Sequence, residues 1–541
     1  MKKDYKSIDD LDDKTRQELL ANDKFFKTVN SKPLDTQQKI ACVLDSKNVQ
    51  IIAGAGTGKT FTLIAKIKYL IAKKHVRPED ILCLSFSNTS VRDLKGKLPE
   101  NVEVRTFHSL GRSVIKQHHK VSVIENNEIL AIINDYLANA NTDTLKDILE
   151  FCDSYFLNIE SYIIRRNDRK ELLNELKEAF TKVAFKPLLA DFINLFKGNN
   201  FTKNHFSYFR SSNDDKDHDI FLKIAEDFYS YYQEYLDMHQ QIDFNDMINE
   251  SSKLIKKYGL KKHYRYILVD EYQDTTYTNY NLIKSLQDKT DAHLTVVGDD
   301  WQSIYGFRGT NIEFFSHFEE YFENPQRIFI EKTYRNPQEL IDIAGSFIMK
   351  NPKQIRKSLK SPKNLKKPVK IIYPQKNPIE KREMIYNLIK DLSEKSEDVL
   401  ILGRTNNNIN QFIKHRNLVK KGNLKKDKFL RILDKTDKSM NNVYYRTLHS
   451  SKGLEADNVV IINMVDDYLS FPSKLKTHSV LNYVNTRNYD YKYSEERRLF
   501  YVGLTRSKNN VYLISDKNNP SEFIEELIDD SLENLEIIEY N

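Results

Sequence analysis

The chain has 541 residues, 40% of them hydrophobic and 30% charged, so it is too long for a single hydrophobic core and is expected to form several domains. It has no apolar run near the roughly 18 residues that span a bilayer, and its charged N-terminus is not a secretory signal, so we expect a cytoplasmic location without membrane contact. The net charge of +7 is modest for this length, and the three separated cysteines indicate neither a disulfide framework nor a zinc site.

The first motif in chain order is a glycine-rich run between a strand-like stretch at 49–52 and a helix-like stretch at 61–72. Its glycines allow a tight turn whose N–H groups point at phosphate oxygens, Lys59 reaches the β- and γ-phosphates, and the Thr60 hydroxyl can ligate magnesium. A turn that merely caps a helix would not need this order of strand, loop, Lys-Thr pair and helix. The run predicts a nucleoside triphosphate site at Ala53, Gly54, Ala55, Gly56, Thr57, Gly58, Lys59 and Thr60, with Ala53 where the strict pattern has glycine.

Strand-like runs alternate with amphipathic helical patterns along the chain, which predicts an α/β fold with parallel sheets. Strands are expected at 49–52, 81–86, 266–269 and 294–297 in the first half, and at 369–373, 399–402, 459–463 and 510–515 in the second. Between them, helical patterns such as 127–137 and 168–183 predominate. We therefore expect a first core at 1–110 and 242–325, a helical insertion at 111–241, and a second core at 326–541.

The strand at 266–269 opens directly into the carboxylates of Asp270 and Glu271. A triphosphate site needs one carboxylate to hold magnesium and another to orient and deprotonate the attacking water. We assign Asp270 to the metal and Glu271 to the water. Acidic loops are commonly just solvated, so this interpretation depends on the phosphate-binding run upstream.

The next strand, at 294–297, leads into a segment that mixes aromatic and polar residues. Gln302 could sense a phosphate, and the rings of Trp301, Tyr305 and Phe307 could stack on nucleic-acid bases beside Arg308. Such clusters often belong to a core, but the interleaved glycines and charges make a packed core less plausible here.

A basic block extends from 350 to 370, with nine lysines and arginines and no Asp or Glu. The block has two interpretations. It is either a solvated loop or a surface that neutralises the backbone phosphates of a nucleic acid, with release of counterions. The composition alone does not choose between them.

Taken together, these motifs resemble those of superfamily 1 DNA helicases of the UvrD/Rep type, in the family's order from about residue 33 to 522. In the first half the resemblance identifies Gln38 as the adenine-reading glutamine, Asp270 to Asp274 as the DExQD box, and Gln302 as the γ-phosphate sensor. The segments 85–88 and 106–109 are similar to those that contact the DNA strand.

The second half carries the remaining family motifs. The resemblance implies that Tyr334 stacks on adenine, that Arg335 contacts the γ-phosphate, and that Arg506 is an arginine finger. The segment 447–455 is similar to one that holds DNA at one end and the nucleotide sugar, through Glu455, at the other. The residues expected to contact DNA are Phe86, Asn88, Thr106, His108, Tyr305, Phe307, Arg308, Thr447 and His449.

The resemblance implies two RecA-like P-loop NTPase cores that share one ATP and Mg²⁺, with 3′ to 5′ movement along single-stranded DNA and unwinding of tailed duplexes at the nucleoid. The segments 298–302, 453–457 and 471–473 most resemble the DNA helicase IV branch. The large mobile insertion of UvrD and Rep must be absent or reduced to a remnant at about 405–446. That departure keeps an alternative open, a DNA-gated ATPase subunit of a repair or anti-phage complex whose protein partner is a separate nuclease.

Overall fold

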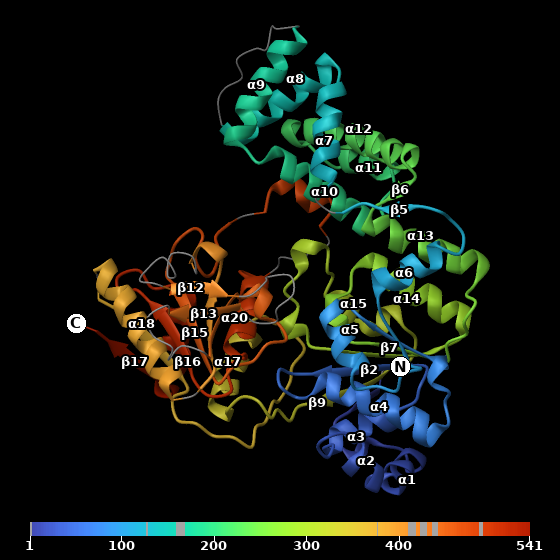
Figure 1. The fold of residues 1–541 in the computed structure, drawn as a ribbon, viewed down its shortest axis with the longest axis vertical. Coiled ribbons are helices and arrows are strands. Elements are labelled where there is room, and N and C mark those ends of the chain that lie inside the picture. Colours follow the sequence, from blue (N-terminus) through green and yellow to red (C-terminus); the bar gives the residue numbers. More distant parts are fainter. Residues whose placement is uncertain are drawn as a thin grey trace.

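The computed structural model describes residues 3–125, 128–157, 168–375, 377–395, 397–408, 418–421, 430–434, 442–475, 477–485 and 491–540. Two lobes, each built around a sheet, lie side by side, and a module of helices stands at one end of the first lobe (Figure 1). The predicted α/β architecture with parallel sheets is confirmed.

The first lobe contains a seven-stranded sheet in which every neighbouring pair is parallel. Its central strands are short apolar runs covered by helices on both faces, so nearly every position in them is buried. In spatial order they are β1 (Lys3–Tyr5), β9 (Gln326–Ile330), β2 (Asn48–Ala53), β8 (His293–Gly298), β7 (Tyr266–Val269), β3 (Ile81–Ser85) and β4 (Glu103–Thr106). The covering helices are α1 (Asp13–Ala21), α2 (Asp23–Thr28), α3 (Thr36–Val43), α4 (Lys59–Lys74), α5 (Asn88–Lys95), α6 (Phe107–Ile115), α13 (Phe244–Tyr258) and α14 (Tyr277–Thr290).

Two elements cross the domain boundaries expected from the sequence. Strand β9 starts at Gln326, where the second core was expected to begin, yet it pairs with β1 and β2 inside the first sheet. Helix α6 continues past residue 110 and packs on α13, so its last turns belong to the first lobe and not to the insertion. We propose that the first core ends at Ile330 and that the insertion starts after Ile115.

The second lobe contains an eight-stranded sheet, parallel except for an antiparallel hairpin at one edge. In spatial order the strands are β12 (Leu418–Lys421), β13 (Leu430–Asp434), β14 (Val443–Thr447), β11 (Val399–Gly403), β15 (Asn458–Met464), β16 (Val511–Ser515), β10 (Val369–Tyr373) and β17 (Leu535–Glu539). Its helices include α17 (Gln338–Met349), α18 (Pro378–Glu394), α20 (Ser494–Leu504) and α21 (Glu522–Ser531). The remnant expected at 405–446 contributes β12, β13 and part of β14, while residues 409–417, 422–429 and 435–441 lie outside the described residues.

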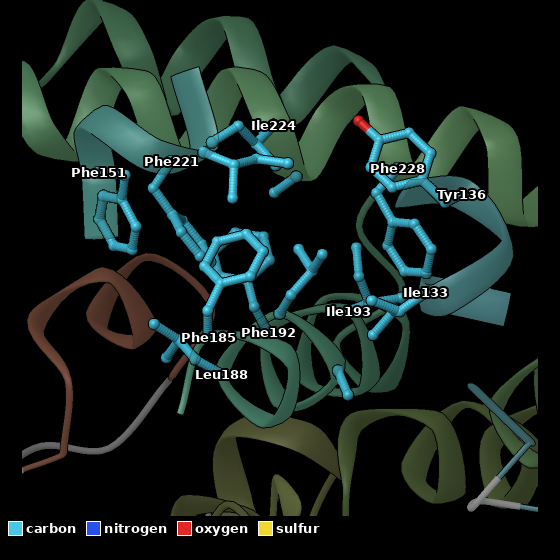
Figure 2. Packing of buried hydrophobic residues seen from close by; sticks show 14 of the residues in the cluster. Ile133, Tyr136, Phe151, Phe185, Leu188, Phe192, Ile193, Phe221, Ile224 and Phe228 are labelled. Atoms are coloured by element: carbon cyan, nitrogen blue, oxygen red, sulfur yellow. The ribbon is translucent and has the colours of Figure 1, made fainter. Parts of the chain in front are cut away.

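The helical module has a hydrophobic core of its own, in which aromatic rings from several helices pack together (Figure 2), the rings of Phe192 and Phe221 edge to face. It contains α7 (Glu128–Asn139), α8 (Thr142–Phe151), α9 (Arg169–Lys182), α10 (Phe185–Gly198), α11 (Asn204–Ser211) and α12 (Lys216–Met238). A short helix of the second lobe, Ser479–Tyr483, completes this core with Val480 and Leu481, and the buried Asn199 side chain donates a 2.7 Å hydrogen bond to the Val484 carbonyl. The module is therefore attached to both lobes.

The parallel topology explains why the sequence motifs gather. The carboxyl ends of β2, β8, β7, β3 and β4 lie at one edge of the first sheet, and each leads into one of the motif segments. No helix among the described residues is long and apolar enough to cross a membrane.

Candidate active site in the cleft between the lobes

The glycine-rich run forms a compact loop between β2 and the first turn of α4. Gly56 and Gly58 have φ angles of +72° and +82°, a region that favours glycine. A Cβ on Gly56 would lie 2.6 Å from the Thr333 hydroxyl and 2.7 Å from Cβ of Arg335, so the segment after β9 lies directly across the loop. The buried Thr333 hydroxyl has no hydrogen-bond partner among the described residues, so it is a polar atom left available beside the loop.

Gln38 lies in the first turn of α3 and is almost fully buried. Its amide nitrogen donates to the Thr57 carbonyl (3.0 Å), and its amide oxygen accepts from the backbone N–H of Asp35 (3.1 Å). The Asp35 carboxylate in turn accepts from the hydroxyl of Tyr334 (3.0 Å), whose ring is 42% exposed. These bonds attach α3 to the phosphate loop and set an exposed aromatic ring beside it.

The two predicted carboxylates follow β7 and face the loop. The Thr60 hydroxyl donates to Asp270 (2.9 Å), and the Gln273 amide donates to Glu271 (2.6 Å). Burial and the neighbouring charge of Glu271 raise the pKa of Asp270. Burial alone would raise the pKa of Glu271 too, but the charges of Lys59 and Lys452 outweigh it and lower that pKa, so Glu271 is the carboxylate held in its ionised form.

Gln302 stands where the two lobes meet. Its amide nitrogen donates to Asp299 (2.6 Å) and its amide oxygen accepts from the guanidinium of Arg506 (3.3 Å). Lys452 of the second lobe also crosses the cleft, donating to Asp274 (2.6 Å) and to the Gln302 carbonyl (2.9 Å). Lys452 is an ion-pairing residue that sequence reasoning passed over, although it lies within the motif at 447–455.

Two arginines approach this point. Arg506 is 1% exposed and also donates to the carbonyls of Val502 (2.8 Å) and Leu454 (3.2 Å), while Arg335 pairs with Glu455 (2.9 Å). Burial and the like charge of Arg335 lower the pKa of Arg506 to about 9. An anion placed between the two guanidinium groups would relieve that repulsion.

The residues around the cleft fit a triphosphate with magnesium. The loop and Lys59 offer donors, a negative charge would relieve the repulsion between the two arginines, and Thr60 and Asp270 offer oxygen atoms that are already in contact with each other. Among the described residues no group of three or more His, Cys, Asp or Glu side chains could hold a metal. Mg²⁺ usually takes one or two carboxylates and completes its shell with phosphate oxygens and water.

A second group of predicted residues forms an aromatic face beside the cleft, made of Tyr305, Phe307, Arg308 and His449. The Arg308 guanidinium lies 5.3 Å from the ring centres of both Tyr305 and Phe307, and the Phe307 and His449 rings meet edge to face at 5.5 Å. Phe307 is 48% exposed. Burial and the charges of Arg404 and Arg308 lower the pKa of His449 to about 4, so its ring is neutral at neutral pH.

The other predicted strand-contacting residues follow β3, β4 and β14. Phe86 packs on Phe107 (4.8 Å) and His108 on Phe244 (5.1 Å). The Thr106 hydroxyl accepts from the Ser109 N–H (3.1 Å), so Thr106 is the N-cap of α6. Asn88 is exposed in the first turn of α5. The hydroxyl groups of Thr447 and Ser450 form a 2.9 Å hydrogen bond.

Two interpretations of the sequence need correction. Trp301 is 1% exposed and packs edge to face on Tyr501 of the second lobe at 5.2 Å, so it is a core residue and not a stacking platform. The basic block is neither wholly solvated nor wholly a phosphate-binding surface, because Lys357 is buried against Asp299 and Asp300, and Lys350 pairs with Glu526 and Asp530. These acidic partners lie far away in the sequence, so no local pattern indicated them.

Comparison with known proteins gives matches along most of the chain. Residues 34–323 match the family model of the UvrD/REP helicase N-terminal domain, and residues 414–518 match that of the UvrD-like helicase C-terminal domain. DNA helicase IV of Escherichia coli is 25% identical over 93% of this chain and 71% of its own length. A probable DNA helicase of Mycoplasma pneumoniae is 25% identical over 89% of this chain and 83% of its own. The ATP-dependent DNA helicase PcrA of Staphylococcus aureus is 27% identical over 69% and 48%.

Proposed function

Because the chain belongs to the UvrD/Rep family of DNA helicases, we propose that it hydrolyses ATP in the cleft between its lobes and thereby moves 3′ to 5′ along single-stranded DNA, separating duplexes. The observation that carries this proposal is the contact of Arg506 with Gln302 at 3.3 Å. It brings a cation of the second lobe to the point where the carboxylates and the phosphate loop of the first lobe converge. The polarity comes from the family and not from any spacing in the chain.

In this mechanism the first lobe binds the nucleotide and prepares the water. Lys59 and the loop N–H groups hold the phosphates, and Glu271, ionised at neutral pH, orients the attacking water and accepts its proton. Mg²⁺, held by Thr60 and Asp270, would neutralise charge on the phosphates. Tyr334 supplies an exposed ring for the base, while Gln38 fixes α3 to the loop.

The second lobe supplies the charge that completes the site. Arg335 and Arg506 stabilise the negative charge that develops on the transferred phosphoryl group, and arginines in this role are worth about 10³ to 10⁵ in rate. They act only when the lobes are close, so hydrolysis follows closure of the cleft. Loss of the phosphate removes the shared anion and lets the cleft open.

The single DNA strand would lie across the aromatic face, where rings can stack on its bases. Stacking is worth about 1 to 3 kcal/mol per base and tolerates any sequence, which suits a motor that must pass every base. Hydrogen-bond readout would instead hold the protein at one site. Tyr305, whose hydroxyl donates to the His449 carbonyl (3.3 Å), links the face to the second lobe.

The test is an unwinding and ATPase assay on duplexes with 3′ or 5′ single-stranded tails, in DNA and RNA versions. We expect DNA-stimulated hydrolysis and unwinding only from the 3′ tail. Hydrolysis without unwinding would instead support the alternative, a DNA-gated ATPase subunit that acts with a separate nuclease. The relatives named above carry helicase names, which favours the first reading.

A further inference from the structure

The loop that carries Gln302 is held from its other side by the segment between α17 and β10, whose Ile355 also packs on the core of the first lobe. We call residues 299–303 the sensor loop and residues 354–357 the clamp segment, which lies between α17 and β10. The clamp bonds to the loop through the Gln354 amide (2.6 Å) and the Ile355 N–H (2.8 Å), both of which donate to Asp300, and the Trp301 indole N–H donates to the Ile355 carbonyl (3.0 Å). With Lys357, three of the four clamp residues therefore contact one loop.

Lys357 is the charged member of this clamp. Its ammonium group lies 2.5 Å from a carboxylate oxygen of Asp299 and 2.5 Å from one of Asp300, and all three side chains are 0–1% exposed. It also lies 4.4 Å from the centre of the Trp301 ring. Two carboxylates side by side in a buried place repel one another and are costly without a cation, so Lys357 makes this loop conformation possible.

The contact continues to the reacting end of the cleft. Asp299, one partner of Lys357, accepts the hydrogen bond from the Gln302 amide nitrogen (2.6 Å), and that bond turns the amide oxygen towards Arg506 (3.3 Å). Gln302 cannot take the opposite amide orientation without placing its oxygen against a carboxylate. The order of contacts is therefore Lys357, Asp299, Gln302, Arg506.

The Trp301 side chain of the sensor loop is buried in the hydrophobic core of the second lobe. With Ile304 it belongs to the same buried cluster as Leu340 and Tyr501 of α17 and α20. Arg498 of α20 adds a 2.5 Å hydrogen bond to the Ser303 carbonyl. If the second lobe moved away from the first, either these contacts would break or the sensor loop would move with the second lobe.

From these contacts we infer that Lys357 is a positioning residue for ATP hydrolysis, which sets the orientation of Gln302 through Asp299 and makes that orientation depend on the seating of the clamp segment. The inference rests on the proposed function and adds to it a route by which the second lobe controls the phosphate sensor. Lys357 itself touches neither the nucleotide loop nor the catalytic carboxylates.

The experiment compares Lys357→Met with Lys24→Met, which removes the same charge from an exposed position on α2, outside the basic block. Each is assayed for ATP hydrolysis with saturating single-stranded DNA. A displaced sensor should cost Lys357→Met between about tenfold and a hundredfold in kcat with little change in KM for ATP. Lys24→Met should keep the wild-type kcat. Wild-type kcat in a folded Lys357→Met protein would overturn the inference.

A second measurement separates positioning from a purely structural role. If Lys357 acts through Gln302, adding Lys357→Met to Gln302→Ala should cost nothing further, because the sensor is already gone. A purely structural residue would instead multiply the two losses, and that result would overturn the inference. If Lys357→Met fails to fold, the double variant Lys357→Met with Asp300→Asn takes its place. This variant keeps only one of the two buried carboxylates, so it should fold. Its kcat should be as low as that expected for Lys357→Met.

Failure of the inference and failure of the proposed function give different results. Absence of DNA-stimulated hydrolysis in the wild-type protein would reject the function before any variant is compared. An active wild type with an equally active Lys357→Met protein would reject only the positioning role.

Discussion

The nucleotide cleft and the aromatic face lie beside each other but are built in opposite ways. In the cleft, Asp270, Gln302 and Arg506 are 1–3% exposed and bond to other residues of the cleft. On the face, Phe307 is 48% exposed and its ring contacts Tyr305, His449 and Arg308. Charges act strongly on a reaction when they are fixed and desolvated, whereas open rings suit the role proposed for the face, that of stacking on each base and then releasing it.

The largest effect should come from removing the groups that act on the phosphates and the water. Lys59→Ala and Glu271→Gln should each abolish measurable ATP turnover, since the first removes a phosphate contact and the second the base. Both should still bind single-stranded DNA without ATP, measured by fluorescence anisotropy, because the aromatic face is untouched. Near-normal hydrolysis in either variant would show that its role is wrongly assigned.

The next effect concerns the two arginines. Arg506→Ala should lower kcat by about 10³ to 10⁵, as expected for an arginine that stabilises the transition state. Arg335→Ala should also slow hydrolysis, but less, because Arg335 is partly neutralised by its 2.9 Å ion pair with Glu455. Steady-state kinetics at saturating DNA measures both. If Arg335→Ala lowers kcat more than Arg506→Ala does, Arg335 is the principal phosphate contact.

A smaller effect is expected on the aromatic face. Phe307→Ala should weaken binding to single-stranded DNA by about 1 to 3 kcal/mol and reduce unwinding, while hydrolysis without DNA stays at its wild-type rate. Tyr208→Ala is the control, because Tyr208 is 68% exposed on α11 and is not one of the residues of this face. Unchanged DNA-stimulated hydrolysis and unwinding in Phe307→Ala would mean that the ring does not stack on bases.

The smallest expected effect tests whether the Thr106 hydroxyl caps a helix, contacts DNA, or does both. Thr106→Ala removes the N-cap of α6 and should destabilise the protein by about 1 kcal/mol, seen as a lower thermal midpoint. Thr106→Ser keeps the hydroxyl and should keep the midpoint. If DNA affinity also falls in Thr106→Ala but not in Thr106→Ser, the hydroxyl serves both purposes.

The sequence predicted much of the first lobe because its strands are apolar runs that stop at recognisable motifs. The strands expected at 49–52, 81–86, 266–269 and 294–297 are present as β2, β3, β7 and β8. No strand was predicted at residues 326–330, which fell within the bounds expected for the second core, and only the pairing of β9 with β1 and β2 places it in the first sheet. Trp301 was misread for a related reason, since an aromatic residue among glycines and charges gives no sign of the lobe that covers it.

By itself, the sequence determined the parallel α/β class and the family, and it predicts the phosphate-binding loop, because these depend on residue type and short spacing. The tertiary structure decided which charged and polar groups meet across long separations: Lys357 with Asp299 and Asp300, Lys452 with Asp274, and Arg506 with the amide of Gln302. It also decided that Ser479–Tyr483 completes the core of the helical module. Such contacts form between segments tens to hundreds of residues apart, and no local pattern records them.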